Sequence, residues 1–264
     1  NINLLEREAV KRLVSGFKPD RVLHLASFSS VRFSWIKPVE SFCNNTNIFL
    51  NLVDALREES SRARILSIGA SEEYGGGRGT HLFDEMDPLL PSSPYAVARV
   101  SQEMLGIMYA KRYGLNLVST RSFNHLGPGQ RPAFVVPSFI QQFVAAKRNG
   151  DSSVDLRTGN LDITRDFTDV RDVVRAYDLL LQKGRPGELY NVCSGRGTSL
   201  REIIGALETI VGIRAKIATD PTLIRPDDPA KIVGDPAKIL QEIDWRPRIS
   251  LMDTLREMVE TCGL

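Results

Sequence analysis

The residues most suggestive of chemistry lie at the start of a predicted helix, where Tyr95 stands four positions before Arg99. Residues four apart on a helix share one face, so a cation at 99 lies beside the phenol at 95. A nearby positive charge favours the phenolate, which makes Tyr95 a candidate proton donor or acceptor near neutral pH. Ser93 and Pro94 are equally typical of an ordinary helix start. On that structural interpretation, the buried stripe of the helix is expected at Val97, Val100, Met104 and Met108.

The elements that must position this pair alternate between strand and helix. Apolar strands are predicted over 21–26, 63–68 and 116–122, with amphipathic helices over 38–59 and 93–112. This order predicts an α/β fold, with a doubly wound parallel sheet covered by helices on both faces. Such a sheet begins with a strand and a Gly-rich turn, and this unit is absent from the sequence or lies upstream of it.

The second half of the chain is predicted to be mainly helical, with Gly- and Pro-bearing connections. We expect the last portion of the sheet to merge here into a smaller C-terminal lobe. The helices of this half are predicted over 135–148, 170–182, 199–211 and 251–261.

Composition limits the class of protein. Of 264 residues, 42% are hydrophobic and 25% charged, which is typical of a globular protein with a substantial core. The net charge of +2 arises from 34 basic and 32 acidic residues without a basic block, so nucleic acid is not expected as a partner. No apolar run approaches the roughly 20 residues that cross a bilayer, so no membrane partner is expected either. Three scattered cysteines, without metal-ligand or disulfide spacing, favour a cytoplasmic location and no metal site.

Four further motifs accompany Tyr95 in order along the chain. They are Leu23-His24-Leu25-Ala26, Ser71-Glu72-Glu73-Tyr74-Gly75, Arg121-Ser122-Phe123-Asn124-His125-Leu126-Gly127-Pro128-Gly129-Gln130 and Arg165-Asp166-Phe167-Thr168-Asp169-Val170-Arg171-Asp172. Together the motifs resemble the extended short-chain dehydrogenase/reductases that act on nucleotide sugars. Within that group they are most similar to the GDP-mannose 4,6-dehydratases and the GDP-4-keto-6-deoxy-mannose reductases. The run that ends at Gln130 favours the reductases, because the dehydratases carry an Arg-rich sequence after the corresponding Pro.

The resemblance implies a fold and a division of the chain. The sheet is expected to be Rossmann-like, and residues 1–122 are expected to form part of a dinucleotide-binding domain. Residues 123–264 are expected to form mainly a smaller α/β substrate lobe, with 166–193 returning to the Rossmann sheet.

The resemblance also implies roles for individual residues. Tyr95 is expected to be the catalytic acid/base, with Arg99 beside it, and Leu25, Ala26 and Ser27 to line the cofactor with their backbone. The implied substrate contacts are Asn124, Arg165, Arg225 and Asp228. Arginine forks match diphosphate oxygens and a carboxylate matches the ribose diol, although the same residues also occur in polar turns and surface ion pairs.

Ala70 stands where the family carries a Ser or Thr whose hydroxyl polarises the substrate carbonyl. A methyl group cannot donate a hydrogen bond. Ser71 is expected to replace that donor only if the backbone turns at the strand end. Glu72 is either a proton abstractor or a strand-end charge. Arg99 replaces the usual Lys and keeps its charge, but its planar head differs from an ammonium.

Three functions are compatible with these residues. The leading one is NAD(P)H-dependent reduction of the 4-keto group of a GDP-4-keto-6-deoxyhexose. The alternatives are a 4,6-dehydratase or 4-epimerase that uses Glu72, and a catalytically weak or silent nucleotide-sugar binder, as Ala70 and Arg99 suggest. The cofactor is NAD or NADP, since the residues that choose between them follow a strand that is not in this sequence.

A homodimer is expected from the resemblance, through the helix that holds Tyr95 and its neighbour. The candidate contact residues pack either across that interface or on their own sheet, and they are Val53, Leu56, Leu105 and Tyr109.

Overall fold

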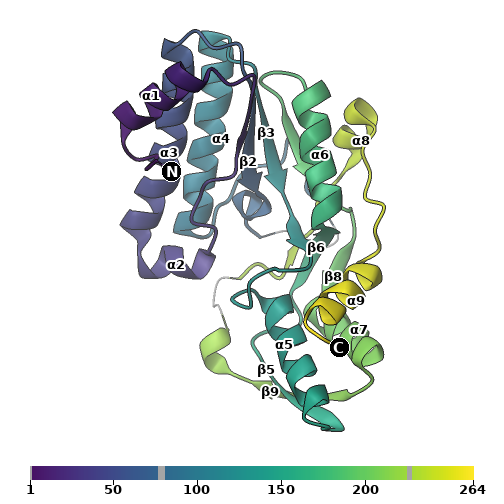
Figure 1. Ribbon diagram of the computed structural model, residues 1–264. Helices are drawn as coiled ribbons and strands as arrows, with labels where there is room; N and C mark the ends of the chain where they lie inside the picture. Colours follow the sequence, from purple (N-terminus) through teal and green to yellow (C-terminus); the bar gives the residue numbers. More distant parts are fainter. Residues whose placement is uncertain (1, 77–80, 225–227) are drawn as a thin grey trace.

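The computed structural model describes residues 2–76, 81–224 and 228–264. Figure 1 shows an upper part built around one sheet and a lower part built around shorter strands. The strands of the upper sheet are all parallel, in the order β1-β2-β3-β7, which confirms the predicted α/β fold. They are β1 (Arg21–His24), β2 (Arg64–Ala70), β3 (Leu117–Ser122) and β7 (Leu189–Val192).

Helices cover both faces of this sheet because successive strand residues point to opposite sides. In β2, Ile65 packs with one group of helices and Leu66 with the other; Leu117 and Val118 of β3 divide in the same way. Figure 1 shows α1, α3 and α4 on one side of the sheet and α6 and α8 on the other. These helices are α1 (Arg7–Phe17), α3 (Pro38–Glu58), α4 (Pro94–Tyr113), α6 (Val170–Lys183) and α8 (Ala237–Ile243).

The lower part combines a small mixed sheet, a separate strand pair and three helices. The mixed sheet has the parallel order β10-β6-β4, with β8 antiparallel to β6, and β5 pairs with β9 in parallel. A hydrophobic core of its own lies between α5, α7 and α9. The elements are β4 (Asn124–Leu126), α5 (Val135–Arg148), β5 (Ser153–Thr158), β6 (Thr164–Asp169), β8 (Gly197–Ser199), α7 (Leu200–Val211), β9 (Arg214–Thr219), β10 (Lys231–Ile232) and α9 (Leu251–Thr261).

The two parts are joined at the ends of β3 and β7. The buried Phe123 carries the chain from β3 directly into β4, and its N–H donates to Val192 O at 3.0 Å. Asp166 of β6 accepts the N–H groups of Ser194 and Gly195, just after β7, at 2.8 and 2.9 Å. The lower part is therefore fixed to the carboxyl ends of the upper strands, while its role as a substrate lobe and the division at residues 122 and 123 stay predictions.

The helix that carries Tyr95 starts where the sequence predicts. Ser93 caps α4 by accepting the N–H of Ala96 at 3.1 Å. Pro94 occupies the first turn, where its missing N–H costs no hydrogen bond of the helix. At the other end Gly114 has a φ of 67°, a left-handed conformation that suits glycine. These two ends fix α4 over the sheet and place Tyr95 in its first turn.

The predicted buried stripe of α4 is wrong. Val97, Met104 and Met108 are exposed, at 42%, 59% and 50% of their surface, whereas the polar Gln102 and Glu103 are buried. The reason is that the sheet offers hydrogen-bond partners to this side of the helix, so polar side chains can be buried there without loss. Within the described ranges, none of the helices has the length and apolarity that a bilayer span requires.

The short elements α2 (Val31–Ile36) and η1 (Ser71–Tyr74) were not predicted. Each is too short to show a helical period in the sequence. Both lie next to strand ends, α2 after the segment that follows β1 and η1 directly after β2, so they shape the region where the predicted site residues lie.

Candidate active site

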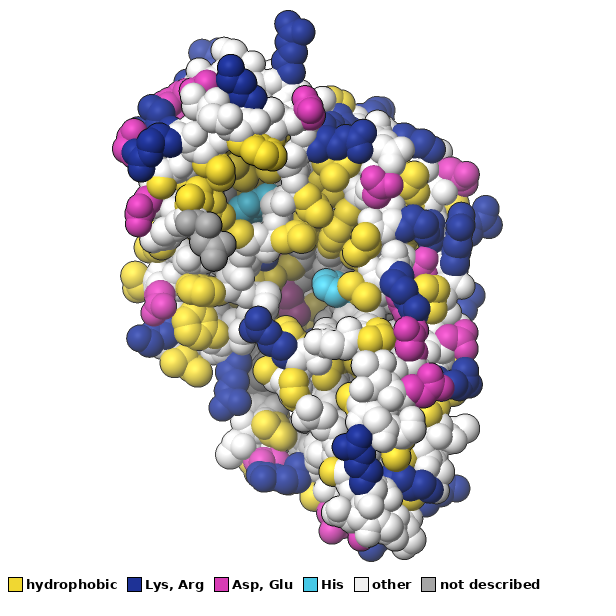
Figure 2. All heavy atoms as spheres, in the orientation of Figure 1, with side chains coloured by type: hydrophobic (Ala, Val, Ile, Leu, Met, Phe, Trp, Pro, Cys, Tyr) yellow, Lys and Arg dark blue, Asp and Glu magenta, His cyan; other side chains and the backbone are white. Residues whose placement is uncertain are grey.

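The predicted site lies where the parallel strands of the upper sheet end. In Figure 1, the arrowheads of β2 and β3 point toward the lower part of the molecule, so the segments after these strands lie on that side of the sheet. Figure 2 shows that this face is hollowed between the two parts and lined mostly by hydrophobic and uncharged side chains. A crevice at the carboxyl ends of parallel strands is the usual ligand site of doubly wound folds.

Tyr95 and Arg99 are in direct contact, as their spacing predicts. The Nε–H of Arg99 donates to the Tyr95 hydroxyl at 3.2 Å, and the guanidinium carbon lies 5.2 Å from the centre of the Tyr95 ring. Both side chains are buried, with 7% and 5% of their surface exposed. The cation therefore lies against both the oxygen and the face of the ring, an arrangement that stabilises negative charge on the phenol oxygen.

The segment after β1 also contacts this pair. Ser27 Oγ accepts a hydrogen bond from Arg99 Nη2 at 2.6 Å, which ties the end of β1 to α4. The next residue, Phe28, is held by the buried Asn45 of α3, whose amide oxygen and nitrogen bond its N–H and carbonyl at 2.8 and 3.1 Å. Leu25 and Ala26, which follow the end of β1, are exposed, and their predicted role in lining the cofactor stays a prediction. Asn45 was not singled out in the sequence, and nothing but its polarity on a buried helix face signals it.

The strand that precedes Ser71 ends one residue earlier, at Ala70, and the backbone turns into η1 at Ser71. Ser71 was expected to replace the missing donor at position 70 only if the backbone turns at the strand end, and the backbone does turn there. The turn is braced by the Glu73 carboxylate, whose Oε1 accepts the N–H of Ala70 at 2.7 Å. Glu72 lies in the same 3₁₀ turn and is half-buried, and its role as a base stays a prediction.

A buried charged cluster lies behind this turn. Arg121 of β3 forms two hydrogen bonds with the Glu103 carboxylate of α4, at 2.7 and 2.8 Å, and its guanidinium lies 4.6 Å from the centre of the Tyr74 ring. Glu73 is fully buried beside this pair. Burial and the charge of Glu103 raise the pKa of Glu73 well above its ordinary value of 4.5. The sequence did not reveal this cluster, because its three charged members come from three separate elements.

The predicted substrate contacts lie in the lower part, and two of them bind each other. Arg165 of β6 donates to Asp228 Oδ1 at 2.5 Å and to the carbonyl oxygen of Pro229 at 2.7 Å. Asn124 begins β4, beside Phe167 of β6. Arg225 lies outside the described residues.

The histidines near the site are placed for packing. Burial and the charge of Arg99 lower the pKa of His24 to about 4, and its ring packs against Phe49 at 5.4 Å between ring centres. Burial also lowers the pKa of His125. In the part of the chain that the structure describes, there is no group of three or more His, Cys, Asp or Glu side chains arranged to hold a metal ion.

The comparisons with known proteins agree with this geometry. A family model described as GDP-mannose 4,6 dehydratase matches residues 1–258. The chain belongs to this family. It is 33% identical, over 243 residues, to the GDP-6-deoxy-D-mannose reductase of Pseudomonas aeruginosa, covering 91% of this chain and 79% of that protein. It is also 27% identical to a bovine (Bos taurus) dTDP-D-glucose 4,6-dehydratase, covering 98% of this chain and 72% of the relative.

Solved structures extend the comparison to the fold. The structure of RMD from Pseudomonas aeruginosa complexed with NADPH matches 99% of this chain and 86% of its own, with a TM-score of 0.91 and 31% identity. A UDP-glucose 4-epimerase from Thermotoga maritima, solved with UDP-glucose, matches 99% of this chain and 82% of its own, with a TM-score of 0.90 and 28% identity. The predicted family and its Rossmann-like fold are thereby confirmed, and relatives of the family include reductases, dehydratases and epimerases of nucleotide sugars.

Proposed function

We propose that this protein reduces the 4-keto group of a GDP-4-keto-6-deoxyhexose with NADPH or NADH. The observation that carries the proposal is the buried contact of Tyr95 with Arg99 at the strand ends. The similarity to a GDP-6-deoxy-D-mannose reductase, and to a structure complexed with NADPH, supports the choice of reaction and cofactor.

The residues at the strand ends fit a nicotinamide cofactor. Leu25 and Ala26 are exposed at the end of β1, and the Tyr95 hydroxyl accepts from Arg99, which leaves its own proton for a ligand. When bound, the cofactor supplies the hydride. Tyr95 then acts as the acid that protonates the carbonyl oxygen, and Arg99 stabilises the phenolate that remains. Ser71 is the proposed hydrogen-bond donor to the same oxygen.

The lower part is proposed to hold the nucleotide. Asn124 and Arg165 are the proposed contacts for the diphosphate, and Asp228 accepts from the ribose hydroxyls. Because Arg165 and Asp228 bind each other at 2.5 Å, a nucleotide must exchange part of this pair for its own oxygens. Arg225 is retained as a further proposed cation.

The test is turnover by the full-length protein of a GDP-4-keto-6-deoxyhexose, followed as loss of reduced nicotinamide absorbance. Tyr95→Phe is expected to lower kcat by about a hundredfold or more, since it removes the acid. Tyr113→Phe, at the exposed end of the same helix, is the matched control and should leave kcat unchanged. Undiminished turnover by Tyr95→Phe contradicts the proposed role.

The other two functions are outcomes of the same assay. A 4,6-dehydratase or 4-epimerase that uses Glu72 turns over without net consumption of reduced cofactor. A silent nucleotide-sugar binder, as Ala70 and Arg99 together suggest, binds a GDP-sugar in calorimetry but shows no turnover until Ala70→Ser and Arg99→Lys are introduced together. Net oxidation of NADPH or NADH by the unmodified protein excludes both.

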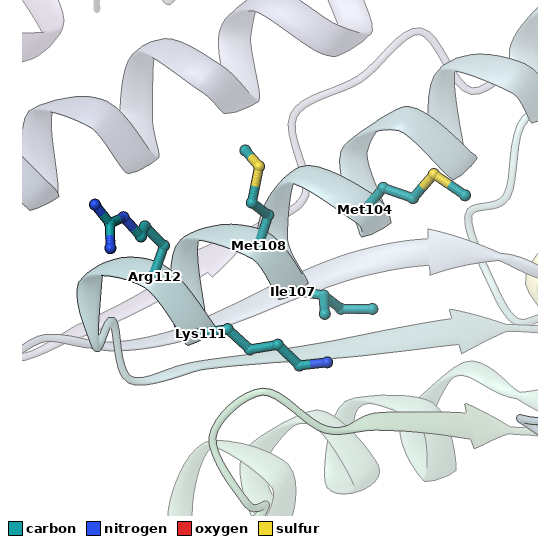
Figure 3. A pocket seen from close by; sticks show the side chains of 5 residues that line it. All are labelled: Met104, Ile107, Met108, Lys111 and Arg112. Atoms are coloured by element: carbon teal, nitrogen blue, oxygen red, sulfur yellow. The ribbon is translucent and has the colours of Figure 1, made fainter.

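We also propose a homodimer and a cytoplasmic location. Val53, Leu56 and Tyr109 are buried within this chain, and Leu105 packs against them. An interface would instead use the exposed apolar side of α4. Figure 3 shows this side, and the residues that project from it are Met104, Ile107, Met108, Lys111 and Arg112.

Sedimentation of the full-length protein tests the dimer. Met104→Glu combined with Met108→Glu places two charges on that face and is expected to yield a monomer. The three cysteines, unpaired in the structure, support a reducing compartment such as the cytoplasm.

A further inference from the structure

Arg99 is held by more than Tyr95. A guanidinium has five N–H donors, and four of those on Arg99 are used by acceptors within the described part of the chain. Besides the Tyr95 hydroxyl, they are the Ile68 carbonyl oxygen at 2.9 Å, Gln102 Oε1 at 2.8 Å and Ser27 Oγ at 2.6 Å. The planar head is therefore fixed in one orientation, and a single N–H remains for a ligand.

Gln102 completes this arrangement from the same helix. Its side chain is 1% exposed, and its amide nitrogen donates to Ser67 Oγ at 2.8 Å and to the Ile68 carbonyl oxygen at 3.1 Å. The orientation of this amide is fixed by its partners, because Arg99 can only donate and a carbonyl oxygen can only accept. Ser67 is fully buried in β2, so the contact anchors the amide to the sheet. Every polar atom of the Gln102 side chain is thus committed to holding Arg99 or to being held by β2.

A lysine at 99 cannot fill these positions. Its ammonium is a compact point charge at the end of a flexible stem, whereas the four acceptors are spread around a planar fork. A Lys has three N–H donors for these four acceptors, so one that reaches Tyr95 would leave at least one of the other three, the Ile68 carbonyl oxygen, Gln102 Oε1 or Ser27 Oγ, without the donor that Arg99 supplies. The residues around position 99 therefore match arginine.

We propose that Gln102, supported by Ser67, is a positioning residue that holds the Arg99 guanidinium on Tyr95, and that this site requires arginine at 99. The inference rests on the proposed catalytic role of Tyr95. It reverses the simplest expectation from the sequence, because Arg99→Lys, which restores the usual family residue, is expected to lower activity.

A double-mutant cycle in the full-length protein tests the inference. Gln102→Met keeps the side-chain volume but removes the amide, and we expect kcat to fall roughly 10- to 100-fold with little change in KM, as for a catalytic group displaced by about 1 Å. In the Arg99→Lys background, the same change should cost less than about twofold, because its target is gone. Ser67→Ala is expected to act in the same direction with a smaller effect. Ser101→Ala, which loses only a bond to the helix backbone at Val97, is the control.

Chemical rescue separates positioning from a merely structural role. Arg99→Ala should regain activity with added methylguanidinium and not with methylammonium, since only the former fits the fork of acceptors. In the combined Arg99→Ala, Gln102→Met protein the rescue should be lost. Equal rescue by the two cations overturns the inference. Equal rescue of Arg99→Ala and of the combined Arg99→Ala, Gln102→Met protein overturns it too.

Failure of the proposed function is recognisable separately. If the unmodified protein does not turn over, or Tyr95→Phe stays active, the catalytic role of Tyr95 is wrong. The same four proteins of the cycle are then compared by urea unfolding, which needs no cofactor or substrate. Coupled losses of stability support the Arg99–Gln102 match, whereas additive losses overturn it. If the catalytic role of Tyr95 holds but the losses in kcat from Gln102→Met and Arg99→Lys are additive, the inference about Gln102 is overturned as well.

Discussion

Glu73 offers the sharpest test of the buried electrostatics. The carboxyl group is fully buried, with Oε1 accepting the Ala70 N–H and Oε2 without a donor in the described part of the chain. Its charged neighbours are the Glu103 carboxylate from α4 and Arg121 from β3, and Arg121 is already paired with Glu103. The 3₁₀ turn also packs against β10, which contributes the uncharged Ile232. Two ionised carboxylates cannot hydrogen-bond each other, so Glu73 is expected to be protonated and to donate to Glu103.

The sign of the pH dependence follows from this proton. The native pKa of Glu73 is raised above the ordinary 4.5, so above that pH the native state keeps a proton that the unfolded chain has lost. Stability is therefore fully present below about pH 4.5 and declines as the pH rises toward the native pKa, by about 1.4 kcal/mol per pH unit. Glu73→Gln keeps the acceptor for Ala70 and a donor for Glu103 but carries no titrating proton. Relative to wild type, Glu73→Gln should therefore gain stability as the pH rises from 5 to 7, because only the wild type has a native proton that its unfolded chain has lost.

Urea unfolding of the full-length protein at several pH values measures this difference. Glu59→Gln, which removes an exposed carboxyl group, is the control and should track the wild type at every pH. A gap between Glu73→Gln and wild type that stays constant over this interval would show that Glu73 is ionised in the native state, and the reasoning would be refuted.

Three further perturbations follow from buried groups. Burial and the nearby Arg99 lower the pKa of His24 from 6.5 to about 4. The free energy of unfolding of the wild type should therefore fall by up to about 3 kcal/mol as the pH drops through that range, and that of His24→Leu should not. Urea unfolding at each pH measures the two proteins. Arg121→Ala leaves the Glu103 carboxylate buried without its partner and should cost about 3–5 kcal/mol in the same assay, with partial recovery when Glu103→Leu is added. Gly69→Ala places a methyl group 2.4 Å from the Thr120 carbonyl oxygen, which should force β2 from β3 and cost about 1–3 kcal/mol; an unchanged urea midpoint would contradict this.

Local patterns gave most of the secondary structure. The helix predicted over 38–59 is observed as Pro38–Glu58, and the strand predicted over 116–122 as Leu117–Ser122. The Tyr95–Arg99 contact was predicted as well, because a spacing of four on a helix brings two side chains together whatever surrounds them. Elements shorter than about two turns were missed because they contain too few residues to show a period.

The hydropathy pattern predicted the wrong buried face for α4. Met104 and Met108 were predicted as core residues but are exposed, whereas Gln102 and Glu103, which the predicted stripe left out, are buried. The partners that make burial of the polar pair favourable are Ser67 and Arg121, which lie 35 and 18 positions away in sequence. No window along the helix contains that information.

The sequence by itself determined the family, the parallel α/β fold and the contact between Tyr95 and Arg99, because these depend on periodicity and on motifs of neighbouring residues. Only the tertiary structure decided how the pair is held, which buried carboxyl group lies beside Glu103, and that Arg165 and Asp228 bind each other. The physical reason is that the free energy of a buried polar group depends on its partners in space. Those partners are brought together by packing of separate strands and helices, so they become visible only once the chain has folded.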